Sequence, residues 1–205
     1  NGVTYNFGKD TRKVYFLSRG NSNSKQGQAT PGFWQVLTDA GVSEHQRLSG
    51  GDEATKTLPR VALASWLTDE EHGAGHLLAR VIVNRLWQHH LGRGIVATPS
   101  NFGSHGVPPT HPLLLDFLAT ELMRGAWKLK PIHQMILKSA VYRQSCEHNP
   151  LAADLDPANQ LWWRRGALRL EAEVIRDSLV AVSGSLAKTM FGKGSLDETS
   201  PKRSV

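Results

Sequence analysis

A chain of 205 residues, of which 40% are hydrophobic, can bury a core, which excludes disorder as the default state. The formal net charge of +6 permits an anionic partner, yet Lys and Arg are interleaved with Asp and Glu except at residues 162–169 and in the tail, so nucleic acid is not expected. The single cysteine, Cys146, excludes an intrachain disulfide and a cysteine-based zinc site, and no apolar run approaches the roughly eighteen residues of a membrane span.

The first segment, residues 1–57, is predicted to be an extended arm or linker. Gly, Ser, Asn and Pro are frequent there, and the run VYFL at residues 14–17 has the composition of one short strand. Burial of four apolar side chains would offset part of the entropic cost of ordering the arm: Phe33, Trp34, Val36 and Leu37. A linker with a few apolar side chains remains the alternative for this segment.

Helical spacing of apolar residues dominates residues 58–190. It predicts helices at residues 58–67, 77–91, 113–124, 131–142 and 168–186. A long loop rich in Pro, Gly and His separates the second of these helices from the third. The expected fold is therefore all-α: a single helical domain at residues 58–190 with an irregular, extended N-terminal arm. Residues 191–205 are predicted to be a polar tail or a connection to missing sequence.

The second predicted helix and the loop after it organise the chain. Arg80, Asn84 and Trp87 form a row at spacing i, i+4, i+7 that is separate from the apolar stripe. Guanidinium, amide and indole groups usually find hydrogen-bond partners when they are partly buried. We therefore expect all three side chains to be at least partly buried and hydrogen-bonded to the loop at residues 98–105.

The same loop offers residue types for hydrolytic chemistry. His105 and His111, with Ser104 and Asp116, could supply a base, a nucleophile and an orienting carboxylate. No G-x-S-x-G motif supports that arrangement, since the sequence VSGSL at residues 182–186 lacks the first Gly. Structural hydrogen bonding or helix capping is favoured for both histidines, and a catalytic role for His105, His111 and Asp116 is the alternative.

Histidines that lie close in the sequence do not predict a metal site. His72 and His76 are separated by glycines that argue against a shared helical face, and no H-E-x-x-H motif occurs. The adjacent His89 and His90 would point about 100° apart on a helix, so they cannot readily bind one ion together. Solvated or packing histidines are the favoured interpretation of both pairs.

The last predicted helix carries several carboxylates. Glu173 and Asp177 are one turn apart, a separation compatible with the two acids of a glycosidase. Ion pairing with Arg169 and Arg176 at i, i+3 and i, i+4 explains the same residues without chemistry and is favoured. The tryptophan pair at residues 162–163 could stack on sugars, but burial in the core is favoured for it.

Five motifs in order carry a family resemblance: SWLT, ARVIVNRLWQHHLGRGIVATPSNFGSHG, THPLLLDFLATEL, LKSAVYRQS and LRLEAEVIRDSLVAVSG. Together they resemble the C-terminal domain of unknown function of large planctomycete and verrucomicrobial proteins. The resemblance covers residues 14–205. It implies an export signal, a cytochrome-c-like haem domain and another uncharacterised domain in the larger protein. We therefore expect this chain to be a fragment or a separately encoded piece, acting in the periplasm or outside the cell.

The resemblance implies no established activity, and the leading hypothesis is a non-enzymatic binding or scaffolding module of an exported multidomain protein. A polysaccharide or an anionic polymer is the expected ligand. No cofactor is expected within the chain, and haem would belong to a missing partner domain. The alternatives are a hydrolase, esterase-like or acting on glycans, that uses the His105/His111 loop, and a docking module for a cytochrome-c-like partner. The candidate binding residues are Arg80, Asn84, Trp87, Arg93, Asn101 and Arg176.

Overall fold

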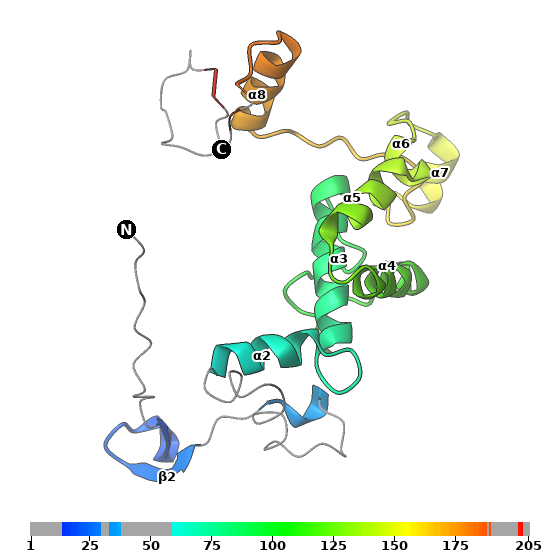
Figure 1. The fold of residues 1–205 in the computed structure, drawn as a ribbon. Coiled ribbons are helices and arrows are strands. Elements are labelled where there is room, and N and C mark those ends of the chain that lie inside the picture. Colours follow the sequence, from blue (N-terminus) through cyan, green and yellow to red (C-terminus); the bar gives the residue numbers. More distant parts are fainter. Residues whose placement is uncertain (1–13, 30–32, 38–58, 188, 190–200, 203–205) are drawn as a thin grey trace. The chain divides into compact units, whose positions relative to one another are not determined.

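The computed structural model describes residues 14–29, 33–37, 59–187, 189 and 201–202 (Figure 1). The fold is mostly helical, as predicted, but the N-terminal arm also contains a small sheet, so the all-α expectation holds only in this coarser form. The predicted domain boundaries after residues 57 and 190 lie outside the described residues. The α-helices in the described part are α2 (Pro59–Thr68), α3 (Gly75–Leu91), α4 (Pro112–Arg124), α5 (Leu129–Lys138), α6 (Ala140–Arg143), α7 (Pro150–Leu155) and α8 (Ala172–Val182).

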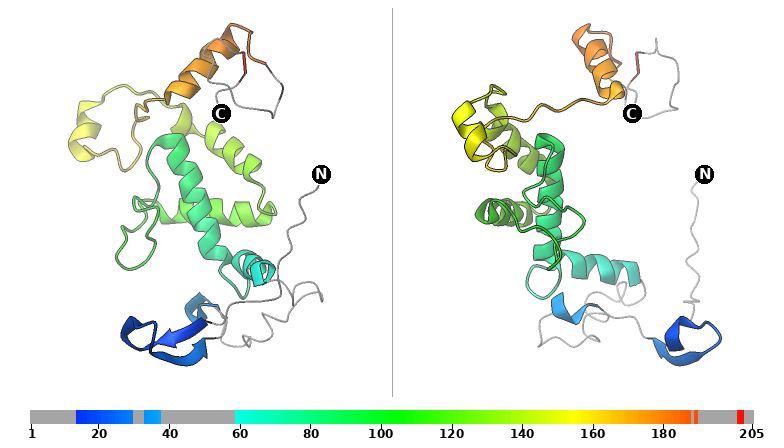
Figure 2. Two further views of the ribbon diagram at one scale, coloured as in Figure 1. Left: turned by 90° about the vertical axis from the view of Figure 1, so that its left-hand side faces the viewer. Right: turned by 180° about the vertical axis from the view of Figure 1, so that it is seen from behind.

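The sheet consists of two antiparallel strands, β1 (Val14–Leu17) and β2 (Lys25–Ala29), which lie side by side in Figure 2. The predicted strand at residues 14–17 is confirmed as β1. Strand β2 has the sequence KQGQA, which contains no β-branched or aromatic residue and so gave no strand signal. A short 3₁₀ turn, η1 (Ser18–Gly20), reverses the chain between the strands.

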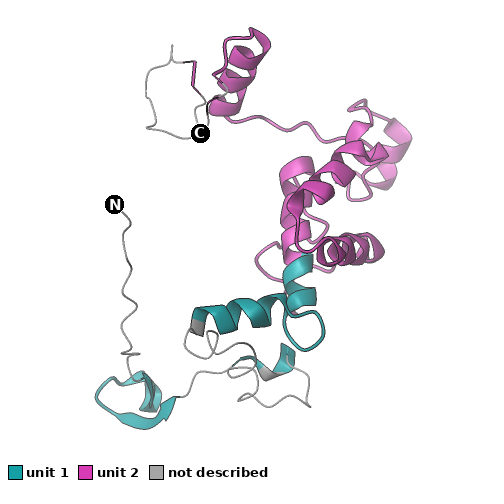
Figure 3. Ribbon diagram, in the orientation of Figure 1, with its two compact units in different colours: residues 1–80 teal, residues 81–205 magenta. Residues whose placement is uncertain are grey.

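The chain divides into two compact units, residues 1–80 and 81–205 (Figure 3). In the first unit, the ring of Phe33 stacks on that of Trp66 in α2, with centroids 5.0 Å apart and planes inclined by 10°. Trp66 is buried, so this contact confirms Phe33 as an anchor of the arm. Trp34 and Val36 are 72% and 90% exposed, and the prediction that they anchor the arm by burial is wrong.

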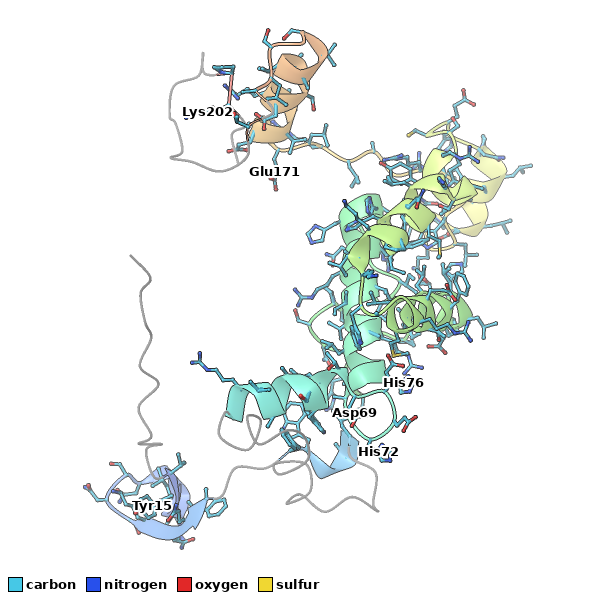
Figure 4. The ribbon with its side chains drawn as sticks, in the orientation of Figure 1. Tyr15, Asp69, His72, His76, Glu171 and Lys202 are labelled. Carbon is cyan, nitrogen blue, oxygen red and sulfur yellow. The ribbon has the colours of Figure 1, made fainter. Side chains whose placement is uncertain are left out.

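Asp69 organises the connection between α2 and α3 (Figure 4). Its carboxylate oxygen Oδ1 accepts hydrogen bonds from the backbone N–H groups of Glu71 and His72, each at 3.0 Å. The backbone N–H of Gly75 then donates to the Asp69 carbonyl at 2.9 Å. His72 therefore lies in a turn rather than on a helix with His76, as the flanking glycines predicted.

In the second unit, α4 and α5 pack against each other. Pro112 begins α4, because a first helical residue needs no backbone N–H. The turn between the helices contains Ala126 and Trp127 at φ values of 52° and 59°. The apolar side chains that α4 and α5 bury follow helical spacing: Leu115, Leu118, Ala119, Leu122, Met123, Ile132 and Ile136.

A serine divides the predicted helix 131–142 into α5 and α6. Ser139 has an extended backbone, with ψ of 153°. Its hydroxyl donates to the Ile136 carbonyl at 2.6 Å and accepts from the Tyr142 N–H at 3.3 Å. Ser139 thus closes one helix and caps the next, which apolar spacing alone does not reveal. The expectation of one continuous helix is therefore wrong.

Two further helices differ from expectation. Helix α7 lies between the predicted helices 131–142 and 168–186, where apolar spacing predicts no helix, and Asn149 caps it by accepting from the Ala152 N–H at 3.3 Å. Helix α8 is shorter than the predicted 168–186, and its side chains Val174, Ile175 and Leu179 are exposed. None of the described helices has the length and apolar character needed to cross a membrane.

Candidate functional site

Asn84 fixes the segment that follows α3. Its amide Nδ2 donates to the Val96 carbonyl at 3.0 Å, and its Oδ1 accepts from the Val96 N–H at 2.8 Å. The Asn84 side chain is fully buried and Val96 is 2% exposed. The prediction that Asn84 is buried and hydrogen-bonded is therefore confirmed. Its partner, however, lies just before the loop at residues 98–105 rather than within it.

Glycines allow this close approach. Gly92 ends α3 with a φ of +84°, which a residue with a Cβ adopts at a cost. A Cβ on Gly94 would lie 2.5 Å from the Val96 carbonyl oxygen and 2.7 Å from Nδ2 of Asn84. The GRG sequence at residues 92–94 is thus a requirement of the Asn84 contact as well as a helix stop.

The other two members of the predicted row behave differently from Asn84. Arg80 is half-buried, in agreement with the prediction. Trp87 is buried and packs edge to face on Trp162, with ring centroids 5.6 Å apart. Its indole N–H has no hydrogen-bond partner among the described residues, so the expected hydrogen bond from Trp87 to the loop is wrong. Trp87 is held by aromatic packing instead.

Thr98 joins the two ends of the loop that follows Val96. Its hydroxyl donates to the Asn101 carbonyl at 2.8 Å and accepts from the Val107 N–H at 3.0 Å. The exposed Asn101 accepts from the Gly103 N–H at 3.1 Å through its Oδ1. Asn101, a predicted binding residue, therefore shapes the loop from within.

Replacing Thr98 by the isosteric valine should remove both hydrogen bonds of the Thr98 hydroxyl. We expect the free energy of unfolding to fall by about 1–2 kcal/mol and the Val107 amide to exchange its hydrogen faster, because each lost hydrogen bond costs roughly 1 kcal/mol. Hydrogen exchange of the Val107 amide measures the effect. Ser104→Ala, which changes an exposed side chain of the same loop, should leave that rate unchanged. Equal exchange rates in Thr98→Val and the parent would contradict this account of the loop.

The predicted catalytic residues lie at three places, in the loop, at the residue before α4 and within α4. His105 is exposed and makes no hydrogen bond with a described residue. His111 precedes α4, where its Nδ1 lies 3.0 Å from the Thr110 hydroxyl, and its side chain does not cap the helix. Asp116 is half-buried in α4. A catalytic role for these three residues stays a prediction.

The carboxylates of α8 also differ from the expected ladder. Arg176 pairs with the adjacent Asp177 at 3.0 Å rather than at a spacing of three or four residues. Its Nη1 also donates to the backbone carbonyl of Lys202 at 3.0 Å. Arg176, a predicted binding residue, is therefore held by contacts within the chain.

A pocket of about 310 Å³ lies elsewhere in the second unit. Three arginines line it, Arg93, Arg164 and Arg165, and no carboxylate lines it among the residues that the structure describes. Cys146 and Trp162 contribute to the wall. Of the predicted binding residues, Arg93 is the one found here, and the basic run WWRR at residues 162–165 supplies the other two arginines.

Hydrogen bonds shape the loop that carries Arg164 and Arg165. Asn159 holds the backbone of Arg164 with two bonds, donating to its carbonyl at 2.7 Å and accepting from its N–H at 3.2 Å. Asp156 accepts from the Leu161 N–H at 2.7 Å, and this bond lowers the pKa of the Asp156 carboxyl, with a smaller contribution from the charge of Arg93. The loop is therefore fixed by two polar side chains that lie outside all the predicted helices.

A cluster of titratable side chains adjoins Arg165. The guanidinium carbon of Arg165 lies 3.9 Å from the centroid of the Tyr142 ring, and its Nη1 donates to the Tyr142 carbonyl at 2.7 Å. On α3, Nε2 of the half-buried His90 lies 2.8 Å from Nδ1 of His133 in α5. His89 is exposed, so the expectation that His89 and His90 face different ways is confirmed.

Sequence reasoning missed His133, Tyr142 and Arg165 as members of one cluster. His90 and His133 are separated by 43 residues, and no local motif joins them. Burial lowers the pKa of His90 below the usual 6.5, and the charges of His133, His89 and Arg165 lower it further. Within the described residues, no three His, Cys, Asp or Glu side chains are grouped so as to hold a metal ion.

Comparison with known proteins assigns the family. The family model PSD1, described as a protein of unknown function (DUF1553), matches residues 59–205. No curated protein and no solved structure matches the chain. The match begins at the first residue of α2 and includes α3, the Asn84 contact, the arginine-lined pocket and α8. Because the family model covers most of the chain, this protein belongs to the PSD1 family of proteins of unknown function.

Proposed function

We propose that this domain is a binding module that holds an anionic group of its ligand in the arginine-lined pocket. The observation that carries the proposal is that Arg93, Arg164 and Arg165 line one concave site at which the described part of the chain places no carboxylate. Guanidinium groups remain charged at any physiological pH and present N–H donors in a planar fork that matches carboxylate, sulfate and phosphate oxygens.

The surroundings of the arginines support binding of a ligand group rather than internal ion pairing. The Arg164 guanidinium lies 4.8 Å from the Trp163 ring centroid, and Arg165 stacks on Tyr142, so aromatic rings position two of the three cations. A volume of about 310 Å³ is at the lower end of small-ligand sites, which suits one charged unit of a larger chain. As the ligand of an exported multidomain protein, a sulfated or carboxylated polysaccharide fits this chemistry. The hydrolase and cytochrome-docking hypotheses stay predictions.

The test compares dextran sulfate with uncharged dextran by isothermal titration calorimetry. We expect dextran sulfate to bind and dextran not to bind. Arg93→Gln should weaken binding by about tenfold or more, because hydrogen bonds to a charged group contribute roughly 1.5–3 kcal/mol. Arg93 is the chosen target because the other two pocket arginines have further contacts, Arg165 with the Tyr142 carbonyl and Arg164 with the Trp163 ring.

Arg143→Gln is the matched control. Arg143 is an exposed arginine of α6 that does not line the pocket, so this variant removes the same charge from another part of the same unit. We expect it to change the affinity by less than about twofold after screening by salt. Equal losses of affinity in Arg93→Gln and Arg143→Gln would mean that dextran sulfate binds in response to net charge alone. The proposal that the pocket is the binding site would then be wrong.

A further inference from the structure

Arg165 belongs both to the arginine-lined pocket and to the cluster around His90. On one side Arg165 is among the residues that line the pocket. On the other side it covers the Tyr142 ring, whose centroid lies 5.9 Å from that of the His90 ring in an edge-to-face arrangement. A single aromatic ring therefore separates an ionisable imidazole from a cation of the pocket.

The His90–His133 contact limits how many protons the pair can hold. At 2.8 Å, one of the two facing nitrogens must donate and the other must accept through a lone pair. One added proton can enter at an outward nitrogen and leave this bond in place. A second would put N–H groups on both facing nitrogens, so the pair takes up one positive charge before its geometry must change.

Among the described residues, each neighbour that shifts the pKa of His90 by its charge opposes that proton. His133 approaches from α5, His89 neighbours it on α3, and Arg165 approaches from the loop that carries the pocket arginines, while Tyr142 of α6 places its ring edge to face with the imidazole. No carboxylate is among the groups that shift the His90 pKa. An anion in the pocket would supply the negative charge that this cluster lacks.

We infer that anion binding in the arginine-lined pocket is coupled to protonation of the His90–His133 pair, so that the protein binds anionic ligands more tightly in mildly acidic surroundings. This inference rests on the proposed function and adds its regulation. Coupling between two sites is reciprocal: protonation of the pair raises the affinity for the anion, and the anion raises the pKa of His90 by the corresponding amount.

The sign of the effect follows from the cluster. Without ligand, the pKa of His90 lies below 6.5, so the imidazole is mostly neutral near neutral pH. As the pH falls below neutral, the His90–His133 pair takes up a proton more readily in the liganded protein than in the free protein. The affinity should therefore increase by about threefold to tenfold between about pH 7.5 and pH 5.5, since a tenfold gain corresponds to raising the pKa by about one.

The experiment measures sulfate affinity at the two pH values by NMR titration, because sulfate keeps its full charge over this range. The parent should show the gain, and its His90 ring resonance should titrate at higher pH with sulfate than without it. His90→Gln, which keeps hydrogen-bonding capacity but cannot take up a proton in this range, should bind sulfate with little dependence on pH. A melting curve of each variant checks that it is folded.

Two histidine variants serve as controls. His89→Gln changes the exposed neighbour on the same helix, and His148→Gln changes the imidazole that lies 6.1 Å from Trp163, ring to ring. Both should keep the pH dependence of the parent, with its midpoint at a slightly higher pH in His89→Gln because one of the groups that lower the pKa of His90 is gone. If sulfate binds but the dependence is absent, or is lost in His148→Gln rather than His90→Gln, the coupling is wrong and the anion pocket stands. If neither sulfate nor dextran sulfate binds at either pH, the proposed function fails and the coupling with it.

Discussion

Asn84→Ala should lower the free energy of unfolding by about 2–5 kcal/mol, because it leaves a buried N–H and a buried carbonyl without partners. Both hydrogen bonds of Asn84 go to Val96, at 2.8 and 3.0 Å, and neither residue is open to solvent. Water therefore cannot replace the amide without entering the core. Chemical denaturation with urea, followed by circular dichroism, measures the change in midpoint and slope.

Asn101→Ala is the matched control for this variant. Asn101 is exposed and its side chain accepts one hydrogen bond, from the Gly103 N–H at 3.1 Å. Water can solvate that N–H after truncation, so we expect a loss below about 1 kcal/mol. Coincident unfolding midpoints for Asn84→Ala and Asn101→Ala would show that the buried amide contributes no more to stability than a surface turn does. The claim that Asn84 organises this part of the fold would then be wrong.

Gly94→Ala should destabilise the protein by about 2–4 kcal/mol, since the added methyl group collides with Asn84 and with the Val96 carbonyl. The ideal Cβ would lie 2.7 and 2.9 Å from the two polar atoms of the Asn84 amide and 2.5 Å from the Val96 oxygen. The buried amide has no open space into which it can move without giving up a hydrogen bond. The measurement is again the unfolding midpoint in urea.

A double-mutant cycle separates this collision from a general effect of alanine. In Asn84→Ala/Gly94→Ala, two of the three crowding atoms are gone, so the combined loss should be smaller than the sum of the single losses by about 1–2 kcal/mol. Gly166→Ala is the control, because no atom lies within 4 Å of a Cβ added there. Strict additivity of the two substitutions would contradict a direct contact between residues 84 and 94.

The sequence predicted the helices whose boundaries are encoded locally. Helix α3 ends at Leu91 as expected, because Gly92 follows the last apolar position, and α4 begins at Pro112, one residue before the predicted start. The break at Ser139 was missed because a serine within an apolar helical pattern is ambiguous until its hydroxyl is seen to bond Ile136 and Tyr142. An Asn-Pro signal at residues 149–150 was available for α7.

The candidate site was less accessible to sequence reasoning than the helices. Arg93 and the basic run at residues 162–165 were noticed separately, but their convergence depends on how the chain returns to α3 after α7. The same is true of His90 and His133, which become neighbours only through the packing of helices. Trp87 shows the opposite error, because its indole was expected to donate a hydrogen bond and instead packs on Trp162. Residue type predicts that a polar group can bond, whereas tertiary packing decides whether it does.

The amide of Asn84 offers Val96 one N–H donor and one carbonyl acceptor side by side, as a strand residue offers its own N–H and C=O to the residue opposite it. The Asn84 side chain thus lets α3 pair sideways with the backbone of the segment that follows it. The peptide groups of the helix itself cannot do this, because they bond to one another within the helix. Val96 is thereby paired as though it lay against a neighbouring strand one residue long. Since only main-chain atoms of residue 96 take part, other apolar side chains of similar volume could occupy that position without altering the pairing. No other side chain offers this geometry at position 84, because Gln has the same amide but is one methylene too long and Asp lacks the donor.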